Sequence, residues 1–92
     1  MKTLSQLVLE TQSYFTTIMS KEMNSIDDHE ERDMALDNLL LDCEFISTEL
    51  QEQPEAYDSV LSFSKLLKEY GEDSMVKELE IGLAYASSIA EA

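Results

Sequence analysis

The chain has 92 residues, of which 43% are hydrophobic, and it carries 20 acidic and 6 basic residues for a net charge of −14. This length fits one domain (residues 1–92) with a single modest core, and the apolar content excludes the composition typical of disordered chains. The negative charge argues against direct binding to nucleic acid or anionic membranes. No apolar run approaches the ~20 residues that span a bilayer, and the single cysteine forms no internal disulfide. We therefore expect a soluble, cytoplasmic protein.

Hydrophobic periodicity predicts four helices joined by short loops, and only two glycines and one proline interrupt the chain. The expected helices run from about Leu4 to Glu22, from about His29 to Gln51, from Pro54 to Gly71, and from Asp73 or Ser74 onward. Thr3 and Gln6 have the spacing of a capping box, and Asp27 or Asp28 is the expected N-cap of the second helix. Pro54 suits a first helical turn, and Gly71 suits a helix end. The sequence thus predicts an all-α bundle of three or four helices.

Negative charge is concentrated in the middle of the chain. Twelve of the twenty acidic residues lie between Asp27 and Asp58, and Arg32 is the only basic residue among them. Charge of this density repels itself and opposes folding. A folded protein that keeps it is expected to use it on a strongly basic partner, although a solvated face without a specific partner is the alternative.

On a helical wheel, the acidic residues of the second predicted helix fall into two rows that flank an outward apolar strip. The first acidic row is Glu30, Asp33, Asp37 and Glu44; the second acidic row is Glu31, Asp42 and Glu49; the apolar strip is Met34, Leu41 and Phe45. Glu52, Glu55 and Asp58 extend the acidic surface beyond this helix. An ordinary surface helix has one apolar stripe and one mixed polar face, so this pattern indicates more than solubility. The apolar strip predicts either a homodimer interface or packing against another helix of the same chain.

No residue pattern indicates catalysis, a metal site or a cofactor. The acidic run around His29 lacks the glycine and spacing of a calcium loop, and one histidine is too few for a di-iron bundle. Cys43 lies in the expected core stripe between Asp42 and Glu44, and nearby anions disfavour a reactive thiolate. We therefore expect a binding protein rather than an enzyme.

The segment from Gly71 to Met75 resembles the Asp-Ser-Leu site of acyl carrier proteins, in which the serine bears phosphopantetheine. That family places the serine near mid-chain with two helices after it, whereas only 18 residues follow Ser74. The simpler interpretation is that Asp73 and Ser74 cap the last helix. A carrier role with Ser74 as the attachment site stays a minor alternative.

Two function classes follow from these residues. A DNA mimic would use the carboxylate rows to occupy the DNA-binding surface of a basic protein, which gains affinity by neutralising phosphates. A helical adaptor or chaperone-like module would use an apolar groove, with its acidity serving mainly solubility. Binding by the mimic should weaken steeply with salt, whereas groove binding should change little.

The length, the acid-rich Asp27–Asp58 segment and the scarcity of Gly, Pro and Cys resemble the anti-restriction nuclease (Arn) family of T-even phages. The resemblance covers the whole chain and rests on size, charge and helical character. It implies an inhibitor that imitates double-stranded DNA and occupies the modified-cytosine-dependent restriction endonuclease of a bacterial host, in the host cytoplasm. Other bacterial DNA-binding proteins, such as nucleoid proteins, are implied as further targets. No catalytic residue carries over, because the family acts by binding.

Overall fold

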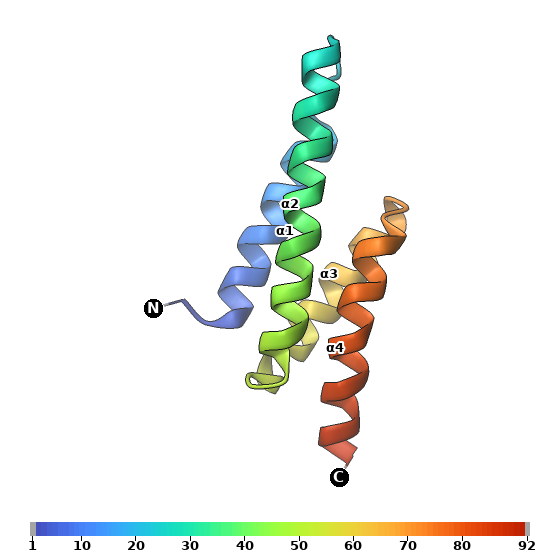
Figure 1. Cartoon of the computed structure of the whole chain (residues 1–92). Helices are drawn as coiled ribbons and strands as arrows, with labels where there is room; N and C mark the ends of the chain where they lie inside the picture. The colour runs from blue at the N-terminus through green and yellow to red at the C-terminus, as the bar shows by residue number, and fades with distance from the viewer. Residues whose placement is uncertain (1, 92) are drawn as a thin grey trace.

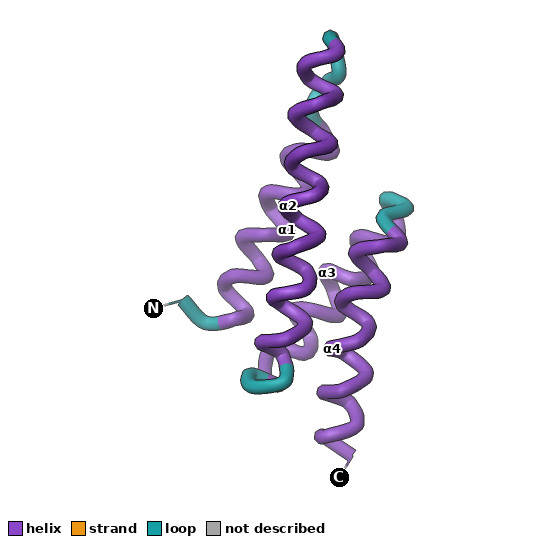
Figure 2. Tube along the Cα trace, viewed as in Figure 1, coloured by secondary structure: helices purple, strands orange, loops and turns teal. Residues whose placement is uncertain are grey.

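The computed structural model describes the backbone of residues 2–91 and the side chains of residues 2–89. Its elements are α1 (Leu4–Ser20), α2 (Ile26–Leu50), the short 3₁₀ turn η1 (Pro54–Ala56), α3 (Tyr57–Glu69) and α4 (Asp73–Glu91). No strand occurs in the described part of the chain. The predicted all-α bundle with short loops is therefore confirmed (Figure 2).

The four helices form two layers that run up and down in alternation (Figure 1). α2 and α4 lie side by side in the front layer and run in the same direction, while α1 and α3 lie behind them. The α1–α2 hairpin is shifted along the bundle relative to the α3–α4 hairpin. The start of α2 therefore extends past the α3–α4 turn, and the end of α4 extends past η1. This stagger gives the molecule dimensions of 51 × 28 × 17 Å.

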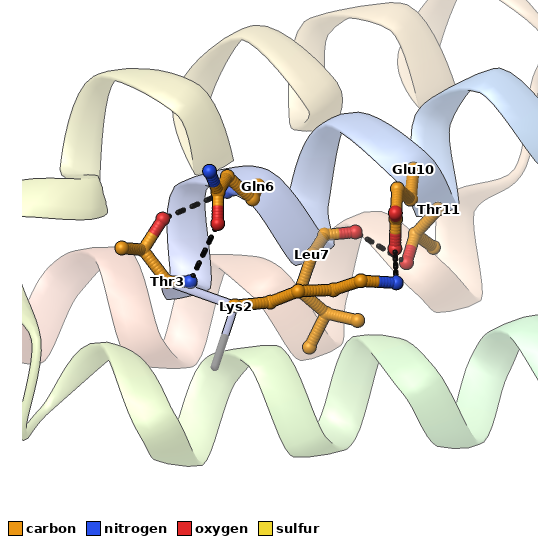
Figure 3. A network of polar contacts seen from close by, with 6 residues as sticks. All are labelled: Lys2, Thr3, Gln6, Leu7, Glu10 and Thr11. Carbon is orange, nitrogen blue, oxygen red and sulfur yellow. Dashed lines mark hydrogen bonds and ion pairs between the residues drawn. The ribbon is translucent and has the colours of Figure 1, made fainter.

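The start of α1 is fixed by the predicted capping box (Figure 3). The backbone N–H of Gln6 donates to Thr3 Oγ1 at 3.2 Å, and the N–H of Thr3 donates to Gln6 Oε1 at 2.9 Å. The N–H of Leu4 donates to Gln53 Oε1 at 3.2 Å, which ties this end of α1 to the turn after α2. α1 ends at Ser20, two residues before the expected end at Glu22.

The start of α2 differs from the sequence-based expectation. Ser25, not Asp27 or Asp28, is the N-cap, and its Oγ accepts from the Asp28 N–H at 3.2 Å. The helix consequently begins at Ile26 rather than His29, with both aspartates in its first turn, where carboxylates favour the positive end of the helix dipole. The Asp28 carboxylate also accepts from the Asn24 N–H at 3.2 Å, so Asp28 contributes two hydrogen bonds to this helix start, one through its backbone N–H and one through its side chain.

The connection between α3 and α4 is a Schellman turn built on Gly71. The N–H of Gly71 donates to the Lys68 carbonyl at 3.1 Å, and the N–H of Glu72 donates to the Leu67 carbonyl at 3.0 Å. Gly71 has φ +77°, a left-handed conformation that side chains with a Cβ disfavour. α4 follows at once, so Asp73 and Ser74 lie in its first turn instead of capping it as expected.

The core draws side chains from all four helices and includes aromatic packing of α1 on α3 and on Tyr70, which follows α3. Phe15 makes edge contacts with Phe63 and Tyr70, at centroid distances of 6.2 and 5.3 Å. Phe63 is fully buried. The fully buried large side chains are Phe15, Phe63, Leu39, Ile46, Leu50, Leu67, Leu79, Val8, Val60 and Cys43.

α2 and α4 approach each other closely at Gly82. A Cβ on this residue would lie 2.5 Å from Ser47 Oγ, 2.6 Å from the Ser47 carbonyl oxygen and 2.8 Å from Ser47 Cα. Real side chains do not tolerate such distances, so only glycine permits the crossing.

Substituting Gly82 by alanine should lower the free energy of unfolding by about 1–3 kcal/mol, because the new methyl group overpacks the α2–α4 contact. This loss would appear despite the gain of about 1 kcal/mol in helix propensity. Urea denaturation followed by circular dichroism measures the change.

A second variant, Gly82→Ala with Ser47→Ala, should not recover the parent stability. The Ser47 carbonyl oxygen and Cα remain in place, and a backbone cannot move aside as a side chain can. A Gly82→Ala protein at least as stable as the parent would show that the two helices do not cross this closely.

Candidate binding surface on α2

The first acidic row is fully available to solvent. Glu30, Asp33, Asp37 and Glu44 are all exposed, and none forms an ion pair with any side chain of residues 2–89. Because these residues project from one continuous helix of 25 residues, the backbone fixes their spacing. The structure therefore brings the predicted first row together as uncompensated negative charge.

A shallow hollow of about 170 Å³ lies beside this row, between α2 and the start of α4. Its lining combines the carboxylates of Asp37 and Glu72 with apolar side chains from Leu36, Leu40 and Met75, and includes Ser74. No basic side chain lines it. The hollow is therefore bordered by acidic residues from both sides, Asp37 on α2 and Glu72 in the turn before α4.

The second acidic row lies on the side of α2 that faces α1, and it is partly neutralised. Lys21 Nζ is 3.3 Å from Glu31 Oε2 and 4.0 Å from Asp28 Oδ1. Glu49 is half-buried, and partial burial raises the pKa of Asp42 above its ordinary value. The two rows are thus not equivalent, and the first presents the less compensated charge.

The apolar strip is also solvent-exposed. The exposed fractions of Met34, Leu41 and Phe45 are 67%, 61% and 53%, so the strip is not buried against another helix of the chain. Phe45 borders an open groove of about 280 Å³ whose lining includes Lys2 and Leu7. The interpretation that the strip is buried against another helix of the same chain is therefore not met among the described residues.

The acidic surface continues past the end of α2. Glu52 follows α2, Glu55 lies in η1 and Asp58 lies in the first turn of α3; all three are exposed. They form no ion pair with the described side chains. The predicted acidic residues therefore follow α2 along its length and continue around its C-terminal end.

Arg32 does not neutralise the rows. It is half-buried between α1 and α2, and its Nη2 donates to Met19 Sδ at 3.2 Å. No carboxylate of residues 2–89 lies within ion-pair distance of it. The single basic residue of the acidic segment thus contacts α1 and forms no ion pair with the acidic rows.

Within the described residues, no group of three or more histidine, cysteine or acidic side chains is arranged to hold a metal ion. Ser74 is exposed in the first turn of α4, which is the last helix, with Glu72 and Asp37 beside it.

Cys43 is fully buried in the core, as its place in the apolar stripe predicted. Burial, together with the nearby charges of Asp42 and Glu78, raises the pKa of its thiol to about 12. The sulfur is therefore protonated at neutral pH and packs as a small hydrophobic group.

A second exposed apolar surface was missed in the sequence. Ile81, Tyr85 and Ile89 on α4 are spaced by four residues and have exposed fractions of 62%, 48% and 44%. Their four-residue spacing is visible in the sequence. The same helix also carries the buried stripe of Val76, Leu79 and Leu83, which dominates its apolar periodicity.

The fold and its surface define a small, acidic, all-α bundle. Comparisons with known protein families, curated proteins and solved structures found no match. Within residues 2–91, each helix is too short or too polar to traverse a lipid bilayer.

Cys43 should resist thiol reagents as long as the bundle is folded, because its sulfur is both buried and protonated. The rate of reaction with Ellman's reagent at neutral pH should rise in denaturant in step with unfolding measured by circular dichroism. Rapid, complete labelling without denaturant would contradict this placement of the thiol.

Replacing Asp42 by asparagine should raise the stability of the bundle at neutral pH. Because the pKa of Asp42 is raised in the folded state, folding favours the neutral carboxyl over the carboxylate. The stabilisation that the neutral carboxyl gives is present at low pH and is lost as the pH rises through the folded-state pKa. Thermal unfolding of parent and variant should therefore converge at low pH and separate toward neutral pH.

The gain in stability of the Asp42→Asn variant should persist at about 1 M salt, where the Debye length is ~3 Å. Salt screens repulsion between surface charges, but it does not remove the cost of desolvating a carboxylate. If the gain disappears in high salt, relief of repulsion is the cause instead.

Proposed function

We propose that this protein is a DNA mimic that occupies the DNA-binding surface of a basic bacterial protein. The observation that carries the proposal is the first acidic row: four exposed carboxylates without ion-pair partners, held along one helix. The resemblance to the anti-restriction nuclease family points to a modified-cytosine-dependent restriction endonuclease as the target. Nucleoid-type DNA-binding proteins are further candidates.

The spacing of the row supports this role in outline. At 1.5 Å per residue, Glu30 and Glu44 lie about 21 Å apart along α2, and Asp33 and Asp37 about 6 Å apart. One DNA strand places a phosphate every ~3.4 Å, so the row offers fewer charges than DNA over the same length. The second row and the residues Glu52, Glu55 and Asp58 add charge along the same element.

The fixed helix also favours binding energetically. A partner's lysine and arginine side chains meet carboxylates whose backbone is already ordered, so little entropy of the acidic segment is lost on binding. A net charge of −14 adds long-range attraction that speeds encounter with a basic surface. Because the first row has no internal partners, no ion pair must be broken before it binds.

A second candidate function is an adaptor that binds an apolar partner through the strip of Met34, Leu41 and Phe45. The exposure of all three residues favours it. The strip lies between the two acidic rows, so a basic partner could also cover it. The dependence of binding on salt distinguishes the two functions, because apolar contacts are not weakened by screening.

Charge reversal of Asp33, Asp37 and Glu44 to lysine should abolish most of the binding to DNA-binding proteins without unfolding the bundle. The three side chains are exposed and unpaired, so circular dichroism should be unchanged. The test is capture from bacterial lysate at low salt, followed by elution first with a salt gradient and then with duplex DNA.

The matched control reverses Glu22, Glu69 and Asp73, which are exposed, form no ion pair with the described side chains and lie outside α2, so it changes the net charge equally. This control should retain the DNA-eluted partner. Equal losses in both triple variants would show that net charge, not the arrangement on α2, governs binding. Retention of the partner by the α2 variant would remove the first row as the contact surface.

A further inference from the structure

The solvent-facing side of α2 has the residue spacing of a coiled coil. An outer seam follows intervals of four, three and four residues, which alternate between the d and a positions of a heptad: Met34, Asn38, Leu41 and Phe45. All four residues are exposed, and the buried residues of α2 lie on the opposite side of the helix. α2 therefore carries two stripes, one that packs in the core and one that faces solvent.

The positions that flank the outer seam are acidic on both sides. With Asn38 at an a position, the flanking carboxylates are Glu30, Asp37 and Glu44 at g positions, and Asp42 and Glu49 at e positions. In coiled coils the e and g residues border the interface and select the partner through ion pairs. None of these carboxylates forms an ion pair with the described side chains, so all of them can pair with a partner's cations.

This charge pattern disfavours a second copy of the same chain on the outer seam. In a parallel pair of helices, the g positions of one face the e positions of the other, and in an antiparallel pair like positions face each other. Both arrangements would set carboxylate against carboxylate. A neutral apolar helix is also a poor partner, because it would partly desolvate the flanking carboxylates without offsetting their charge.

We propose that the outer seam binds an amphipathic helix of the basic partner, with apolar residues at a and d and with lysine or arginine at e and g. The flanking carboxylates pair with those cations, and the seam covers the partner's apolar stripe. A single asparagine at an a position fixes the register of a coiled coil, and Asn38 has this position. The inference rests on the proposed function for the partner's charge, and it adds the structural element that α2 recognises.

The outer seam leads into an apolar groove at its C-terminal end. Phe45 borders the groove of about 280 Å³ between α1 and α2, whose lining includes Leu7. Leu7 is half-buried, so a helix that extends past Phe45 gains a further apolar contact there. Met34 and Phe45 are about 17 Å apart along α2 at 1.5 Å per residue, which is about three helical turns of contact.

A synthetic peptide of four heptads, with leucine at a and d and lysine at e and g, tests the proposal. A control peptide has the same residues in an order that forms no apolar stripe. By fluorescence anisotropy with the full-length protein, the heptad peptide should bind one-to-one and about tenfold more tightly than the control, since burying one large apolar side chain contributes that much. Equal binding of both peptides would overturn the outer seam as a docking site, although the DNA mimic, which needs only the carboxylates, would stand.

Variants locate the contact. Leu41→Ser should weaken binding of the heptad peptide about tenfold and leave binding of the control peptide unchanged. Leu41 is 61% exposed, so circular dichroism should show an intact bundle. The matched control, Ile81→Ser, changes an α4 residue that is 62% exposed, and it should affect neither peptide. Unchanged binding of the heptad peptide by Leu41→Ser, or an equal loss in Ile81→Ser, would place the contact elsewhere and overturn the proposal.

Leu41→Ser also separates this inference from the proposed function. In capture from bacterial lysate, the variant should retain less of the partner that duplex DNA elutes. Full retention by Leu41→Ser, with loss of that partner in the charge-reversed α2 variant, would overturn the docking of a helix while the DNA mimic stands. Seam-dependent binding of the heptad peptide without any DNA-eluted partner would remove the proposed function and leave the docking site in place.

Discussion

The contact between α2 and α4 at Gly82 is the constraint on which the acidic surface depends. Like-charged neighbours one turn apart on α2 each cost about 0.2–0.5 kcal/mol, so the exposed side of this helix opposes its own formation. Each buried Leu or Ile contributes about 1.5–3 kcal/mol, and α2 buries Leu39, Ile46 and Leu50. Burial exceeds repulsion only while α4 lies close enough to cover these side chains. The close approach at Ser47 and Gly82 thus permits a helix that carries this much charge.

The bundle distributes its few cations unevenly, and this makes the two sides of α2 different. Of the described ion pairs, only those of Lys21 reach the acidic segment, and they lie on the side that faces α1. Lys68 pairs instead with Glu80, between α3 and α4. The first acidic row therefore has no ion-pair partner among the described side chains. An added cationic surface gains most there, because it displaces no existing pair.

The sequence predicted those features that local physics decides, and it missed those that tertiary contacts decide. The four helices, the capping box of Thr3 and the helix end at Gly71 follow from periodicity and local hydrogen bonding. The start of α2 was misplaced because Ser25, Asp27 and Asp28 are all good N-caps, and Ser25 takes the position while the two aspartates enter the first turn. The helical wheel places the rows and the strip on different sides of α2, but their exposure depends on where α1 and α4 pack.

Charge divides the surface of this molecule into regions that respond differently to salt. On α2, unpaired carboxylates favour a cationic partner, and screening weakens that attraction. On α4, residues 81–90 carry no charged side chain, and Ile81, Tyr85 and Ile89 expose apolar surface whose contacts screening does not weaken. Because α2 and α4 lie side by side and approach closely at Gly82, the fold holds these two surfaces in a fixed relation (Figure 1).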